Sequence, residues 1–179
     1  LSASSATHRN PQLYFLDWMG RNLMNFSGMG LTAYLDHRWA LEPYGFKSSI
    51  GGHSFHQWLP PSEYFQKHPE YYALIDGKRS AASKGAQITL GNPEVIDTIV
   101  ARMIAYKQQH PELEVLPFGY NDSWTNGFGW GDDPLDRQLD SPRDLPQAGS
   151  KRPRTYSTRY IKAANQVIER VNKVYLDVK

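Results

Sequence analysis

The chain of 179 residues has no cysteine, no long apolar run and almost no net charge. Without cysteine, neither a disulfide framework nor a thiolate metal site can form. A transmembrane helix needs about 20 consecutive apolar residues, and no segment approaches that length. The formal net charge of +2 is too small to indicate a nucleic-acid partner. With 40% hydrophobic and 21% charged residues, the composition is typical of a globular domain.

Aromatic residues are the clearest enrichment, with 11 tyrosines and 5 tryptophans, many of them in predicted loops. An exposed aromatic ring can stack on a sugar ring, whose C–H faces are apolar and whose edges carry hydroxyls. Tyrosine and tryptophan also build protein cores, and we expect part of this set to do so. The enrichment therefore favours a polar, ring-shaped ligand without proving one.

Strand and helix patterns alternate along the chain, which predicts a parallel α/β sheet. Asp76-Gly77 predicts a hairpin with a type I′ turn, and 62–65 predicts a short helix that breaks at His68-Pro69. Asn92-Pro93-Glu94 predicts the start of the clearest helix, which Pro111 ends. We expect strands at 22–26, 46–55, 87–90 and 115–120, and further helices at 10–19, 31–41 and 156–175, the last with an apolar face made of Tyr160, Ile161, Ala164, Val167, Ile168, Val171 and Val174.

Polar and aromatic side chains gather in 51–79, GGHSFHQWLPPSEYFQKHPEYYALIDGKR, on a predicted strand end and the loop after it. Such side chains at a strand's carboxyl end can hold a polar substrate. We expect His53, His56 and Trp58 to contact substrate, with packing against one another as the alternative. If the two residues between the histidines are extended, the rings face opposite ways. With no cysteine and no carboxylate nearby, we expect no metal at this histidine pair.

A second strand end of this kind lies at 119–124, GYNDSW. Glycoside hydrolysis usually needs two carboxyl groups, one protonated to serve the leaving oxygen and one ionised. Asp122 is the catalytic candidate, and Asn121 and Trp124 are candidates for holding the sugar. The alternative is that Asp122 caps the following turn.

The long Gly/Pro/Asp-rich segment 125–154 is either a wall of the site or a mobile insertion. It contains Asp132 and Asp133, which could reach over the site as the second carboxyl group. Gly-Asp-Asp-Pro is also ordinary turn chemistry. A third possibility is that the partner acid lies beyond Lys179.

Asn25 ends the first expected strand and could donate a hydrogen bond to a substrate hydroxyl. Arg21 precedes that strand and could pair with a uronate carboxylate. Because the start of a barrel strand lies away from the site, a structural salt bridge is the expected role of Arg21.

The blocks GGHSFHQWLPP, HPEYYALIDGKR and QITLGNPEV, followed by a strand ending in Asn121-Asp122, resemble an uncharacterised bacterial glycoside-hydrolase-like family, a domain of unknown function. The resemblance runs from about Arg21 to the C-terminus. That family is distantly similar to α-glucuronidases and β-hexosaminidases, which are (β/α)8 barrels. Many relatives carry a cysteine cluster after the Asn-Asp, whereas this chain has SWTNGFGWGDDP, which leaves the substrate open.

The resemblance implies part of a (β/α)8 TIM-type barrel, with about four βα units, a hairpin excursion and the long loop. A whole barrel takes about 250 residues, so we expect a fragment of a larger chain, completed in cis or by a partner chain. Residues 1–9 are expected to be a disordered or leftover arm, and 10–179 the barrel domain.

The resemblance further implies an oligosaccharide or polysaccharide partner, no cofactor, and a periplasmic or extracellular location in a bacterium. The working hypothesis is hydrolysis of glycosidic bonds with Asp122 as acid/base. A non-catalytic glycan-binding module on the same barrel and a structural fragment of a larger assembly are the alternatives.

Overall fold

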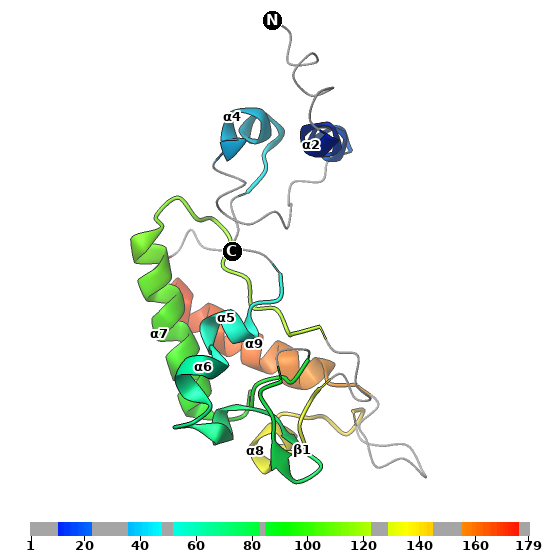
Figure 1. Ribbon diagram of the computed structural model, residues 1–179, viewed down its shortest axis with the longest axis vertical. Coiled ribbons are helices and arrows are strands. Elements are labelled where there is room, and N and C mark those ends of the chain that lie inside the picture. The colour runs from blue at the N-terminus through cyan, green and yellow to red at the C-terminus, as the bar shows by residue number, and fades with distance from the viewer. Residues whose placement is uncertain are drawn as a thin grey trace, which may run out of the picture. The chain divides into compact units, whose positions relative to one another are not determined.

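The computed structural model describes residues 11–22, 36–47, 52–82, 85–122, 129–144 and 155–175. The described residues contain several helices and one small two-stranded sheet, so this part of the chain is of mixed α and β class (Figure 1). The chain divides into two compact units, the first made of 1–52, 109–117 and 177–179, the second of 53–108 and 118–176. The expected arm 1–9 lies outside the described residues.

The first unit contains α2 (Pro11–Arg21), α4 (Arg38–Leu41) and the 3-10 turn η1 (Glu42–Tyr44). Helices α2 and α4 contact each other (Figure 1), and Met19, Leu41 and Phe46 are buried. Arg21 Nε donates to Asp17 Oδ2 at 2.8 Å, which confirms the structural salt bridge expected for this arginine.

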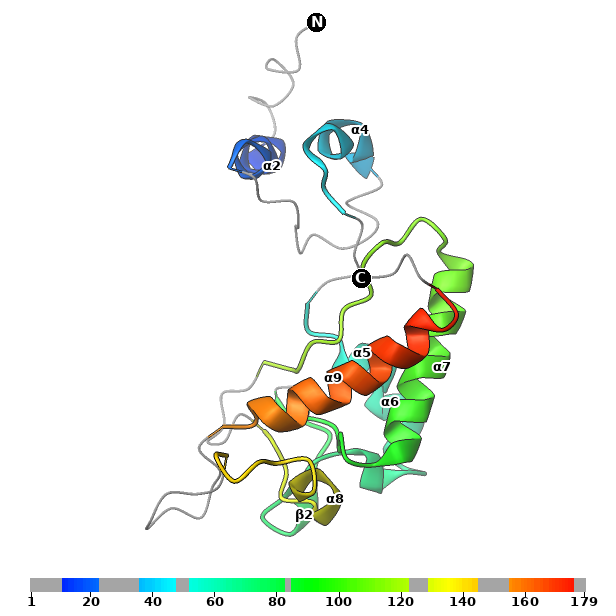
Figure 2. The ribbon, with the colours of Figure 1, turned by 180° about the vertical axis from the view of Figure 1, so that it is seen from behind.

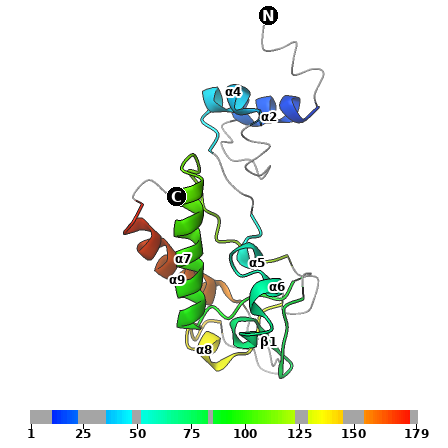
Figure 3. The same cartoon turned by 60° about the vertical axis from the view of Figure 1, so that its left-hand side comes forward.

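Two long helices supply much of the core of the second unit: α7 (Pro93–Gln109) and α9 (Ser157–Asn172). Asn92 Oδ1 accepts from the Glu94 backbone N–H at 3.0 Å and Pro93 is the first helical residue, as the sequence predicts. Figures 2 and 3 show α9 crossing α7, and Arg170 on α9 pairs with Asp97 on α7 at 2.5 Å. The two helices bury Val95, Ile96, Ile99, Val100 and Met103 from α7 and Ala163, Val167 and Val171 from α9.

The hairpin predicted at Asp76-Gly77 is present as β1 (Leu74–Ile75) and β2 (Lys78–Arg79). Both turn residues have positive φ, 49° for Asp76 and 75° for Gly77. Positive φ at both central residues is the mark of a type I′ turn, as the sequence predicts. Hairpins favour this turn because its backbone twist matches the twist of the flanking strands. Before the hairpin, α6 (Pro61–Tyr64) confirms the predicted short helix, and η2 (Pro69–Tyr71) follows it.

The predicted strands at 87–90 and 115–120 do not form: each segment holds a single bridge position, Ile88 in the first and Val115 in the second. Ile88 forms an isolated antiparallel bridge with Tyr72. The Gln87 backbone N–H donates to the Gly129 carbonyl, and the Gln87 carbonyl accepts from the Ala73 N–H. The two-stranded β1–β2 sheet is the one sheet that the described residues form. The (β/α)8 barrel therefore stays a prediction.

The expected strand 46–55 is wrong at its carboxyl end, where α5 (Phe55–Trp58) begins. The backbone N–H groups of Ser54 and Phe55 both donate to the Gly119 carbonyl, and Ser54 Oγ accepts from Gly119 N–H at 2.8 Å. These bonds hold the start of α5 against the Gly119 backbone, and the fully buried Phe55 ring packs on Phe118 at 4.9 Å. The other early strand, 22–26, lies outside the described residues beyond Asn22.

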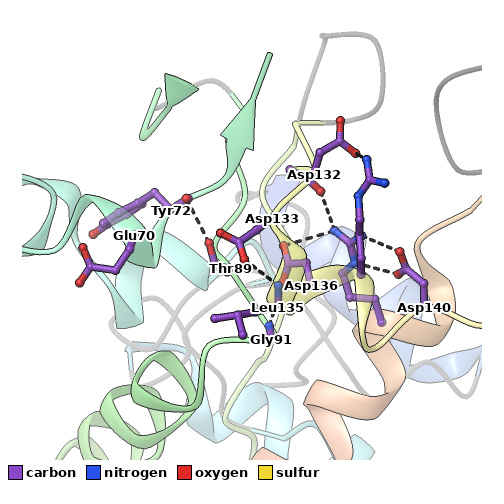
Figure 4. A network of polar contacts seen from close by, with 12 residues as sticks. Glu70, Tyr72, Thr89, Gly91, Asp132, Asp133, Leu135, Asp136 and Asp140 are labelled. Atoms are coloured by element: carbon purple, nitrogen blue, oxygen red, sulfur yellow. Dashed lines mark hydrogen bonds and ion pairs between the residues drawn. The ribbon is translucent and has the colours of Figure 1, made fainter. Parts of the chain in front are cut away.

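One of the buried side chains of α9 is an arginine, Arg159. Arg159 is fully buried and donates to Asp140 through Nε at 2.9 Å and Nη2 at 2.8 Å, to the Gly131 carbonyl at 2.8 Å and to Asp136 at 3.3 Å. Figure 4 shows Asp136 and Asp140 converging on this guanidinium. The predicted apolar face of α9 is therefore partly wrong, because Ile161 and Ile168 are exposed while the buried row runs through Arg159 and Ala163.

A second arginine, Arg79 of the hairpin, is bonded to the segment 129–144, which also supplies the partners of Arg159. Arg79 pairs with Asp133, whose Oδ1 also caps α8 (Pro134–Arg137) by accepting from Leu135 N–H at 2.8 Å. Arg79 further donates to the Tyr72 carbonyl at 2.9 Å. The Thr89 hydroxyl donates to the same carbonyl at 3.1 Å, as the dashed line in Figure 4 shows. Part of the segment predicted as a wall or mobile insertion is thus a packed element of the second unit.

We predict that the contribution of Asp136 to stability falls as pH rises from about 4 to 7, by at most about 1.4 kcal/mol per pH unit. Burial raises the pKa of Asp136 from 3.8 to about 7, against the opposing attraction of Arg159 and the Gly91 N–H bond. In that window the native state keeps a proton that the unfolded state has lost, so the proton stabilises the native state at low pH and is lost at high pH.

Urea unfolding at several pH values measures this effect, with Asp136→Asn as the comparison. Burial lowers the pKa of His56, which acts in the opposite sense below pH 6.5 but equally in both proteins. The difference between the two proteins should fall with rising pH, and a constant difference would contradict the prediction.

Candidate functional site

His53, Tyr120 and Asp122 form an exposed polar surface in the second unit. His53 Nδ1 lies 2.8 Å from the Tyr120 carbonyl oxygen, which can only accept, so Nδ1 carries the proton and donates. In the neutral ring Nε2 is then an acceptor, and it lies 4.0 Å from Asp122 Oδ2. The His53 and Asp122 side chains are 62% and 75% exposed, so both can meet a ligand from solvent.

Aromatic rings extend from this surface into the core. Tyr120 is 49% exposed and lies edge-on to Tyr160 at 5.7 Å and tilted to Trp130 at 6.2 Å. Trp130 in turn stacks on Tyr156 at 5.5 Å, and Tyr160 OH donates to the Phe118 carbonyl at 2.5 Å. The Tyr120 ring is therefore held by neighbouring rings while part of its surface stays open.

Asn121 faces inward, although sequence reasoning made it a sugar ligand. It is buried, and its Nδ2 donates to the Ala86 carbonyl at 2.8 Å. Its backbone N–H and carbonyl pair with the Gln87 side-chain amide at 2.8 and 2.7 Å. These bonds fix the backbone that leads into Asp122, so Asn121 acts in this structure as a positioning residue.

The other two substrate-binding candidates of 53–58 are less exposed than His53. Trp58 is 2% exposed and lies edge-on to Tyr106 at 5.7 Å, so its ring belongs to the core. The His56 ring lies 6.1 Å from the ring of Tyr72, and the main effect on its pKa is a lowering by burial. His56 Nε2 is buried and finds no hydrogen-bond partner among the described residues. Trp58 therefore packs in the core, which was the alternative to substrate contact that we considered from the sequence.

Two candidate contacts, Asn25 and Trp124, lie outside the described residues. The loop acids considered as a second carboxyl group are both ion-paired: Asp132 with Arg137 at 3.3 Å, and the buried Asp133 with Arg79. Asp122 is therefore the carboxylate of the surface formed by His53, Tyr120 and Asp122. Both loop acids are engaged in ion pairs and do not serve as its second carboxyl group in this structure.

A separate set of side chains, which sequence reasoning missed, could hold a metal. His68, Glu70 and Glu94 place one possible ligand atom each within 4.8 Å of one another. The first two are two residues apart in the sequence, which was a readable signal. Glu94 comes from the first turn of α7, and only the folded chain brings it to them.

The chain belongs to the family described as a domain of unknown function, DUF4838, whose model matches residues 2–178. No curated protein and no solved structure matches it. None of the helices in the described residues has the length and apolarity to cross a membrane. The family membership carries no activity with it, so any function has to be argued from the side chains.

We predict opposite stability effects at the two neighbouring positions of the Asn-Asp pair. Asn121→Ala should lower the free energy of unfolding by about 1–3 kcal/mol, because it leaves the buried Ala86 carbonyl without its donor. Asp122→Ala should change it by less than about 0.5 kcal/mol, because the side chain is largely exposed. Urea unfolding at pH 7 measures both variants, and equal losses would contradict the assignment of Asn121 to positioning and Asp122 to the surface.

Proposed function

We propose that this chain is the sugar-contacting part of a carbohydrate-active protein that hydrolyses glycosidic bonds. In this proposal His53, Tyr120 and Asp122 contact the sugar, and Asp122 serves as the acid/base group. The observation that carries the proposal is the exposed Asp122 carboxylate, 4.0 Å from His53 Nε2, with the half-exposed Tyr120 two residues before it in the chain.

The pair of acceptors fits a polyhydroxylated ligand. With its proton on Nδ1, the His53 ring offers Nε2 as an acceptor, and the Asp122 side chain offers an oxygen acceptor 4.0 Å away. Adjacent hydroxyls of one sugar ring can donate one hydrogen bond to each. The apolar C–H face of the same ring can then stack on Tyr120, which the surrounding rings hold in place.

A role of Asp122 as general acid/base is supported by its position directly after a segment of backbone that hydrogen bonds hold in place. A carboxyl group that protonates the leaving oxygen must lie within hydrogen-bond reach of it, so the group has to be positioned before the substrate arrives. The reciprocal Gln87–Asn121 pairing and the His53 bond to Tyr120 fix the residues on the amino-terminal side of Asp122. The side chain itself remains open to solvent.

A second candidate is a glycan-binding module that cleaves nothing. It is favoured by the ion pairs of Asp132 and Asp133, because glycosidases usually place a second carboxyl group about 5–10 Å from the first. This candidate uses the same surface of His53, Tyr120 and Asp122 and differs only in the absence of turnover.

The test is a hydrolysis screen of the full chain on aryl-glycosides and on uronic-acid and N-acetylhexosamine oligosaccharides. We expect Asp122→Asn to lower turnover by about 100-fold or more, because general acid–base catalysis supplies that much. Asp97→Asn, which changes an exposed acid on α7, is the matched control and should retain wild-type turnover. Turnover retained in Asp122→Asn would remove this residue from the mechanism.

Calorimetric titration with the same oligosaccharides separates the two candidates. Saturable binding without product would favour the binding module. In either case Tyr120→Ala should weaken binding about tenfold, the loss expected for one aromatic stacking contact. Tyr14→Ala, which removes an exposed tyrosine of α2, should not change the affinity. Equal affinities of the Tyr120 and Tyr14 variants would exclude this surface as the sugar site.

A further inference from the structure

His68, Glu70 and Glu94 converge from two elements of the second unit. His68 precedes η2, Glu70 lies within it, and Glu94 lies in the first turn of α7. One imidazole nitrogen and two carboxylate oxygens lie within 4.8 Å of one another, and His68 Nδ1 and Glu70 Oε1 are separated by 3.1 Å. We propose that these three side chains bind a divalent transition-metal ion of the Zn²⁺ type.

His68 Nδ1 and Glu70 Oε1, which form a hydrogen bond, are also at a distance that two ligands of one metal ion can adopt. Metal–ligand bonds of about 2.0–2.2 Å at angles between 90° and 109° place two donor atoms about 2.9–3.6 Å apart. The His68–Glu70 separation of 3.1 Å falls in this range. The Glu94 carboxylate is exposed, and its ligand atom lies within 4.8 Å of both of the others.

The charges at this cluster also call for a cation. Two carboxylates face one another, and among the described residues no lysine or arginine forms an ion pair with Glu70 or Glu94; the recorded partners are His68 and the Tyr71 hydroxyl. A bound dication would relieve the repulsion between the two carboxylates.

Tyr71 holds two of the ligands in place. Its ring is buried and stacks on the His68 ring at 4.6 Å with an interplanar angle of 17°. Its hydroxyl donates to Glu94 Oε2 at 3.1 Å, which leaves Oε1 for an ion. A hydrogen bond to a ligating carboxylate is the usual support around metal sites, and it orients the ligand in advance.

The backbone around the ligands is restrained as well. Pro69 follows His68 and Pro93 precedes Glu94, and each proline fixes φ in its own ring. Arg79 Nη1 donates to the Glu70 carbonyl at 3.4 Å, which ties this residue to the network in Figure 4.

The donor set decides between classes of metal. Imidazole together with carboxylates suits Zn²⁺ and its neighbours, whereas Ca²⁺ and Mg²⁺ prefer sites made of oxygen alone. Three protein ligands leave a coordination position open for water or substrate. The His68 and Glu70 side chains are partly exposed, so such a position can be reached from solvent.

The test is titration of the full metal-free chain with Zn²⁺ by calorimetry, and with Co²⁺ by its visible absorption. We expect one saturable site, with Kd raised by tenfold or more in His68→Gln and Glu94→Gln. Tyr71→Phe, which removes only the hydroxyl, should raise Kd by about 10-fold. Thermal denaturation without metal checks that each variant is folded. If His68→Gln or Glu94→Gln does not fold, the more conservative Tyr71→Phe still tests the proposal.

His110→Gln is the matched control. His110 Nδ1 lies 3.4 Å from Glu112 Oε1, with the same two-residue spacing as His68 and Glu70. It is not in a group of three metal-capable side chains among the described residues. Wild-type affinity in this variant, with loss in the His68 and Glu94 variants, would support the site. Unchanged affinity in those two variants, or binding of Mg²⁺ as tight as that of Zn²⁺, would overturn the proposal.

Discussion

The packing of the second unit depends on the hydrogen bonds and ion pairs that the buried Arg159 guanidinium makes. A buried cation is tolerated only when carboxylates and carbonyls surround it, and removing one partner of a buried pair commonly costs about 3–5 kcal/mol. Asp136, Asp140 and the Gly131 carbonyl supply those partners. Asp136 also accepts from Gly91 N–H at 2.8 Å, so one aspartate joins α9, the loop and the segment before α7. At Gly91 a β-carbon would lie 2.1 Å from the Leu135 carbonyl oxygen, so this approach requires glycine.

The exposed surface of His53, Tyr120 and Asp122 follows from how the backbone before it is held. Tyr160 on α9 bonds the Phe118 carbonyl, Ser54 bonds Gly119, and Gln87 pairs with Asn121. Each of these bonds uses a backbone group of 118–121, so the segment is fixed without a wide sheet. Asp122 comes next in the chain and remains exposed, which is why neighbouring residues of similar polarity have different roles.

Local signals in the sequence predicted local structure well, and they failed where burial depended on distant partners. The caps and prolines of α7 and the Asp76-Gly77 turn act within a few residues, so their outcome was readable. Strand 46–55 and the apolar face of α9 were misjudged because the bonds to Gly119 and the charges around Arg159 come from residues far along the chain. Within the candidate site, the sequence found His53 and Asp122 but could not tell that Asn121 and Trp58 turn inward.

The sequence by itself determined the positions of the main helices, the hairpin turn and the grouping of polar and aromatic residues near two segment ends. These features rest on backbone preferences and on spacing along the chain, which need no tertiary information. Only the tertiary structure decided which of those polar groups face solvent and which satisfy one another inside. It also brought Glu94 to His68 and Glu70, because contacts across more than twenty residues depend on how helices and loops pack.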